Sequence, residues 1–154
     1  DATSHLLRRT YRALGEVMLS IADESNRLQA LIDAAWKQFF TTPLYRAYIE
    51  LLAESQRDAA LAEALRSMFQ RGRGLFEPAV SHYFEPVPGA KVDINGLFLQ
   101  LISFLGGLAA QAHLLDEKEH IQPQIKLWLK QSALLMQAKK GVRAAPPKPE
   151  TWDR

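Results

Sequence analysis

A run of 22 residues without Asp, Glu, Lys or Arg, at residues 94–115, constrains the fold of this chain more than any other feature. Its apolar residues recur at helical spacing, so we expect a helix that is covered on nearly all sides. A second amphipathic segment follows at residues 121–138. Because one set of neighbours in a chain of 154 residues rarely covers such a helix, the run predicts burial against the chain's own core on one face and against a second copy on another.

The same run is long enough to cross a bilayer core of about 30 Å, so a membrane span is the first alternative. Acidic residues flank the run at Asp93 and Asp116, where a cytoplasmic anchor shows Lys or Arg, and no Trp or Tyr marks its ends. Five polar side chains lie within it: Asn95, Gln100, Ser103, Gln111 and His113. These features favour a buried helix and no membrane partner. We expect a cytoplasmic protein, with which the absence of cysteine is compatible.

Composition narrows the class of protein. With 47% hydrophobic residues, the chain is expected to form one domain that buries roughly 70% of its unfolded surface. It has no cysteine, which excludes disulfide frameworks and thiolate metal sites. Its net charge of +2 is too small to imply a nucleic-acid footprint for the chain as a whole. We place the folded domain at residues 1–140 and a flexible, proline-rich tail at residues 141–154.

Apolar residues recur with a helical period along the chain, and no segment alternates like a strand. The sequence therefore predicts an all-α bundle of about six helices. We expect them at about residues 4–22, 27–39, 43–52, 58–83, 94–115 and 123–138.

Several helix ends have local signals. Ser25 or Asn26 can cap the second helix, while Asp58 and Asp93 can cap the fourth and fifth. Pro43 suits the first turn of the third helix, where its missing N–H has no partner to lose.

The fourth helix has the weakest interior. It contains Gly72, Gly74 and Pro78, which predict a kink or a break. Residues 85–92, with two prolines and a glycine, are expected to form a loop. Residues 139–141, Lys-Lys-Gly, suit the end of the sixth helix.

The last two helices carry the argument for association. On the fifth, small and polar residues share one stripe opposite a stripe of large apolar residues. The sixth has a wider apolar arc than one core contact requires. Two such antiparallel helices predict a homodimer joined by a symmetric four-helix interface, with a larger monomeric bundle as the alternative. We assign to this interface Ser103, Gly107, Gln111, Leu114, Leu127, Trp128, Gln131 and Leu134.

Aromatic and flexible side chains gather on the inward sides of the middle helices, with a histidine and a glutamine as orienting groups. Helices around a wide core can leave an apolar cavity, so these residues predict a site for a largely apolar or aromatic small molecule. Ordinary core packing is the alternative for each residue taken singly. The candidate ligand-binding residues are Trp36, Phe39, Tyr48, Met68, Phe69, Phe76, His82, Tyr83, Phe98, Gln100 and Phe104.

Support for catalysis is weak. Glu117 and His120 have the Glu-x-x-His spacing of di-metal carboxylate bundles, but the motif occurs once and lies in a polar connection, so we expect a solvated turn. No nucleophile, zinc, phosphate-loop or dinucleotide motif is present. We therefore predict a protein that is not an enzyme and that binds no cofactor or metal. A helical adaptor domain stays open as an alternative, and a metalloenzyme as a weaker one.

Three segments carry a family resemblance. They are YRAYIELLAESQ at residues 45–56, RDAALAEALR at residues 57–66 and LGGLAAQAHLLDEKE at residues 105–119, which a last amphipathic helix follows. With the order of the helices, they resemble the C-terminal regulatory domain of TetR (tetracycline-repressor) family transcriptional regulators over about residues 2–140.

The resemblance implies a domain that binds a small-molecule effector and dimerises, within a transcriptional repressor. Members of the family read operator DNA with an N-terminal helix-turn-helix domain, which residues 1–154 do not supply. The first helix resembles the family's connecting helix, which passes an effector-driven shift to that DNA-binding domain. We therefore expect this chain to have no sequence-specific DNA binding of its own.

Overall fold

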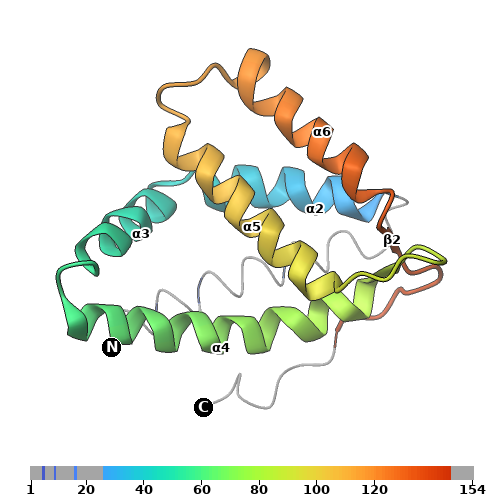
Figure 1. The fold of residues 1–154 in the computed structure, drawn as a ribbon, viewed down its shortest axis with the longest axis horizontal. Helices are drawn as coiled ribbons and strands as arrows, with labels where there is room; N and C mark the ends of the chain where they lie inside the picture. Colours follow the sequence, from blue (N-terminus) through green and yellow to red (C-terminus); the bar gives the residue numbers. More distant parts are fainter. Residues whose placement is uncertain (1–4, 6–8, 10–15, 17–25, 147–154) are drawn as a thin grey trace.

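The computed structural model describes residues 5, 9, 16 and 26–146, so the predicted helix at residues 4–22 lies almost wholly outside the described residues. The elements from residue 26 onward are α2 (Arg27–Ala35), the π turn η1 (Trp36–Phe40), α3 (Pro43–Glu54), α4 (Ala59–Tyr83), β1 (Phe84–Pro86), α5 (Ile94–Gln111), the π turn η2 (Glu117–Ile121), α6 (Gln122–Ser132) and β2 (Met136–Ala138). Apart from two short strands, the described elements are helical, which confirms the predicted all-α class (Figure 1).

The predicted signals start three of these helices. The Asp58 carboxylate accepts hydrogen bonds from the backbone N–H groups of Ala60 and Leu61, at 2.9 and 3.0 Å, and so caps α4. Asp93 caps α5 in the same way, through the N–H of Asn95 at 3.0 Å. Pro43 occupies the first turn of α3. Each device satisfies or avoids a backbone donor that has no partner inside the helix.

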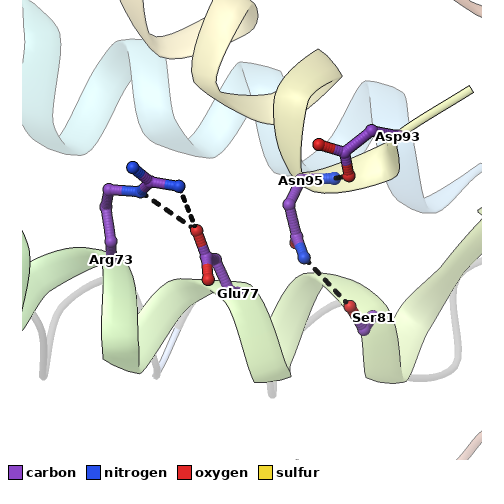
Figure 2. A network of polar contacts seen from close by, with 5 residues as sticks. All are labelled: Arg73, Glu77, Ser81, Asp93 and Asn95. Atoms are coloured by element: carbon purple, nitrogen blue, oxygen red, sulfur yellow. Dashed lines mark hydrogen bonds and ion pairs between the residues drawn. The ribbon is translucent and has the colours of Figure 1, made fainter.

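The predicted break in α4 is wrong, because the helix runs continuously from Ala59 to Tyr83 with Pro78 inside it. Pro78 cannot donate to the carbonyl of Gly74, and both residues are exposed, so water can solvate that carbonyl. An ion pair bridges the weak region, since Arg73 Nη2 lies 2.7 Å from Glu77 Oε1 (Figure 2). Burial of Val80 and Tyr83 in the core then holds the last turn in place.

The sixth helix ends earlier than predicted, at Ser132, and the chain turns into strand β2. β2 pairs antiparallel with β1, with Phe84 opposite Ala138 and Pro86 opposite Met136. Both Phe84 and Met136 are buried, so the strand brings an apolar side chain into the core that a continued helix would place elsewhere. The expectation that the chain has no strand is therefore wrong, as is the extension of the helix to residues 138–141. The predicted loop at residues 85–92 begins inside β1.

The segment after β2 lies against the end of α4. The Lys139 N–H donates to the carbonyl of Tyr83 at 2.8 Å, and Lys139 Nζ donates to the carbonyl of Ser81 at 2.6 Å. These bonds satisfy carbonyls at a helix C-terminus, where a cation is favourable. The Arg27 guanidinium donates to the carbonyl of Val142, whose side chain packs against the core. The folded unit therefore extends beyond residue 140, into the segment predicted as a tail.

Helix α5 crosses the middle of the molecule, from the end of α4 toward the connection that leads to α6 (Figure 1). Near its start, Asn95 Nδ2 donates to Ser81 Oγ on α4 at 3.5 Å (Figure 2). Its inner face consists of Ile94, Phe98, Leu101, Leu105 and Leu108, all of which are buried. The core therefore forms around this face of α5, as the sequence predicts.

Candidate functional site

Five aromatic side chains from η1 and α3 form a continuous group against α5, which we call the aromatic cluster. Phe40 lies at its centre, with ring centroids 6.3 Å from Trp36, 5.1 Å from Phe39 and 4.9 Å from Tyr45. Tyr48 extends the cluster, 5.9 Å from Tyr45. Most of these pairs adopt the edge-to-face or tilted arrangements that aromatic rings prefer.

A glycine on α5 lets the cluster approach the helix backbone. The Tyr45 hydroxyl lies over Gly106, and a Cβ at position 106 would collide with its oxygen. Phe40 lies next to the same position, with its Cε1 atom 3.8 Å from where that Cβ would be. Gly106 is thus required here by close approach of a side chain rather than by its backbone angles.

Both phenols of the aromatic cluster are held in the neutral form. Burial raises the pKa of Tyr45 to about 12, and the neighbouring Tyr48 acts in the same direction. Burial also raises the pKa of Tyr48 above its usual value. A tyrosine is neutral at physiological pH, and burial keeps these two neutral to a more alkaline pH, so the aromatic cluster holds two uncharged hydroxyl groups among apolar rings.

The remaining aromatic candidates do not join this cluster. Phe98 packs against Phe84 at 5.0 Å, and Tyr83 contacts His82 at 4.8 Å, both near the end of α4. Burial raises the pKa of Tyr83, partly offset by the Arg27 guanidinium, which lies 5.0 Å from its ring centroid. This second group is tied to the chain's own segment after β2, because His82 Nε2 lies 2.9 Å from the carbonyl oxygen of Ala144.

The other predicted ligand-binding residues lie on α4 and α5. Met68 and Phe76 are half-buried on α4, and Phe104 is half-buried on α5. Phe69 is 46% exposed, and Gln100 lies exposed on the opposite side of α5 from the core. The structure therefore brings together Trp36, Phe39 and Tyr48 from the predicted set and adds Phe40 and Tyr45, which sequence reasoning missed.

The burial of Phe40, one of the two missed residues, follows from the π turn. In η1 the N–H of Thr41 bonds to the carbonyl of Trp36 at 3.1 Å, five residues back. The wider turn shifts the inward position from Phe39 to Phe40, and Phe40 is buried while Phe39 is half-buried. A regular helical period cannot anticipate that shift, although two adjacent phenylalanines mark the place where it occurs.

The outer face of α5 is exposed in the single chain. It consists of Gln100, Ser103, Gly107 and Gln111, and a Cβ built at Gly107 meets nothing within 4 Å. Ser103 Oγ donates to the carbonyl of Leu99 at 3.0 Å, and Gln111 Nε2 donates to that of Gly107 at 3.1 Å. These two donors are bonded within the helix, so covering them would not leave them without a partner.

Exposed leucines occur just after α5, on α6 and in the turn after α6. Leu114 and Leu134 are each 74% exposed and Leu127 is 57% exposed, although Leu134 lies in the turn after α6 rather than on the helix. Gln131 is exposed beside them in sequence, and Trp128 is half-buried. We call the outer face of α5 together with Leu114, Leu127, Gln131 and Leu134 the association surface. Exposed large apolar side chains are typical of surfaces that bind a partner.

Length and composition alone would also let α5 cross a membrane, the one described helix of which this is true. Of its 18 residues, 39% are buried in the protein. The core helix of a globular domain has the same composition.

The Glu-x-x-His segment forms a capped turn. Asp116 accepts hydrogen bonds from the backbone N–H groups of Lys118 and Glu119, at 2.9 and 2.8 Å. Glu117 accepts a hydrogen bond from the indole Nε1 of Trp36 at 3.0 Å, a role that sequence reasoning did not foresee. Within residues 5, 9, 16 and 26–146, no three His, Asp or Glu side chains are grouped so as to hold a metal ion.

Comparison with known proteins gives no assignment. No protein-family model, curated protein or solved structure matches this chain.

Proposed function

We propose that this chain is the regulatory domain of a TetR-type transcriptional regulator, which dimerises and binds a largely apolar or aromatic effector. The sequence resemblance motivates this proposal, and the order of the helices is compatible with it. In such a regulator a separate helix-turn-helix domain contacts operator DNA. The domain itself has no catalytic role.

The single observation that carries the proposal is the division of α5 into two faces. Its inner face forms the core, while its uncharged outer face stays open in the single chain. Large exposed leucines occur after α5 and on α6, and on the outer face Ser103 and Gln111 donate to carbonyls of their own helix. A second copy that applied the same surface across a two-fold axis would remove this apolar area from water.

The aromatic cluster supports the effector part of the proposal. It contains two neutral phenols and an indole next to α5, the helix that carries the association surface. A ligand that inserted among these rings would press on the inner face of the same helix. Ligand binding and association would then share one structural element, which regulation requires.

Effector binding is tested by the shift in melting temperature of residues 1–154 against a library of apolar and aromatic compounds. We expect at least one compound to stabilise the native chain, and Phe39→Ala to weaken its affinity about tenfold by removing one ring of the aromatic cluster. Phe69→Ala, on the exposed side of α4, is the matched control and should leave the affinity unchanged. If Phe69→Ala alone weakens the binding of a compound, the site does not lie at the aromatic cluster. If no compound in the library stabilises the native chain, the proposal that it binds an effector is contradicted.

A gel shift at physiological salt tests the DNA part of the proposal. Because the chain has a net charge of only +2, we expect weak binding that competitor DNA abolishes. Tight, competitor-resistant binding to one sequence would show that these residues read DNA directly. It would contradict the proposal that a separate helix-turn-helix domain contacts the operator.

A further inference from the structure

Two π turns, η1 and η2, are joined by one side-chain hydrogen bond across 81 positions of the sequence. Trp36, the first residue of η1, donates its indole N–H to Glu117, the first residue of η2, at 3.0 Å. The same carboxylate oxygen accepts a hydrogen bond from Gln122 Nε2 at 2.7 Å, at the start of α6. π turns are uncommon and occur often at functional positions, so a direct bond between two of them merits an explanation.

The bond joins a buried donor to an exposed turn. Trp36 is only 4% exposed, so its N–H needs a partner within the protein. Glu117 supplies that partner from an exposed turn, where a carboxylate would otherwise be fully hydrated. A charged acceptor makes a stronger hydrogen bond than a neutral one. The indole is therefore satisfied only while η2 stays seated against the core.

This bond lies where α6 enters the core. Ile121 ends η2 and Ile125 follows one turn later, and both are almost completely buried. Beyond them Leu127 and Gln131 are exposed as parts of the association surface. On the other side, Trp36 belongs to the aromatic cluster through its contact with Phe40 at 6.3 Å. One hydrogen bond thus connects the aromatic cluster to the segment that packs the start of α6 against the core.

We propose that the Trp36–Glu117 hydrogen bond is a latch that holds η2 and α6 on the core and releases them together when the indole moves. The two apolar anchors, Ile121 and Ile125, are carried on the same short unit, so release of the latch loosens both. Glu117 is then a positioning residue, which acts on α6 through Trp36. The latch itself does not depend on the proposed function; only its consequence, that an effector displacing Trp36 would alter association, rests on it.

Amide hydrogen exchange of the full chain, followed residue by residue by NMR, tests the latch. Trp36→Phe keeps an aromatic ring but removes the N–H donor, and Glu117→Ala removes the acceptor. We expect each variant to accelerate exchange of the α6 amides about tenfold relative to those of α3 and α4, because local opening of one unit becomes easier. Glu119→Ala, in the same exposed turn, is the matched control and should leave α6 unchanged.

The double variant distinguishes one bond from two separate effects. Glu117 also accepts from Gln122, so if both residues act through the same bond, Trp36→Phe combined with Glu117→Ala accelerates α6 exchange no more than Glu117→Ala alone. Equal acceleration of exchange over the whole chain would show general destabilisation and overturn the latch. Unchanged exchange in α6 would also overturn it. So would a double variant in which the accelerations of the two single variants multiply. These outcomes do not require a dimer. A monomeric chain would therefore contradict the proposed function, whereas the exchange rates of α6 alone decide whether the latch exists.

Discussion

The two faces of α5 differ in side-chain size and in burial, although neither carries a charge. Large side chains such as Phe98 and Leu105 fill the core on the inner face, whereas Gly107 and Ser103 lie exposed on the outer face. Absence of charge therefore has two different causes in one helix. On the inner face it reflects packing within the chain. On the outer face we attribute it to packing between chains, because a face that stays in water has no need to exclude charge.

The largest expected effect is on the inner face. Leu105 is 1% exposed, so Leu105→Ala should lower the free energy of unfolding by about 2–5 kcal/mol through lost burial and a residual cavity. Chemical denaturation followed by circular dichroism measures this change. Ile102→Ala, one turn away and 38% exposed, is the matched control and should cost clearly less. Equal costs would mean that burial does not set the cost of truncating a side chain on α5.

Two adjacent glycines sharpen the comparison. Gly106→Ala places a methyl group against the Tyr45 hydroxyl and should lower the free energy of unfolding by about 1–3 kcal/mol. Gly107→Ala meets open space within the chain and gains helix propensity, so it should cost clearly less than Gly106→Ala. Thermal unfolding at one protein concentration compares them.

A rescue variant tests the cause of the first effect. Tyr45→Phe removes the hydroxyl that the new methyl group meets, so it should recover part of the stability lost in Gly106→Ala. If the double variant is as unstable as the sum of the single ones, another contact explains the need for glycine.

The aromatic cluster predicts a smaller, pH-dependent effect. The pKa of Tyr45 is about 12 in the folded chain against 10.0 for an ordinary tyrosine, so the unfolded chain loses this proton first. Stability from Tyr45 is therefore complete below about pH 10 and declines as the pH rises toward about 12. Tyr45→Phe should flatten this part of the curve of unfolding free energy against pH. An unchanged slope in the variant would place the titrating group elsewhere.

Local chemistry made much of this fold predictable. Asp58, Asp93 and Pro43 mark helix starts by hydrogen-bonding rules that depend only on near neighbours. The two faces of α5 follow from its period, because inward and outward residues separate by size. The assignment of the outer face to a dimer stays a prediction.

The features that could not be predicted from the sequence depend on contacts between residues far apart in the chain. The π turn at Trp36 breaks the helical period, so sequence reasoning did not place Phe40 in the candidate site. The three-residue strands are too short to alternate, and β2 forms because β1 and the end of α4 offer it partners. Glu117 looked like a solvated residue because its donor, Trp36, lies far away in the sequence. The helical period alone predicted that the sixth helix continues to residue 138, although residues 136–138 form β2.

The central claim is that the outer face of α5 joins two copies of the chain. Sedimentation velocity at micromolar concentration tests it on the native chain and on Gly107→Arg, which places a charge in the proposed contact at a cost of several kcal/mol. Gly74→Arg, at an exposed glycine of α4 that also faces open space, is the matched control. The account predicts two chains per particle for the native protein and the control, and one folded chain for Gly107→Arg. A monomeric native protein, or a Gly107→Arg variant that remains a stable dimer, would contradict it.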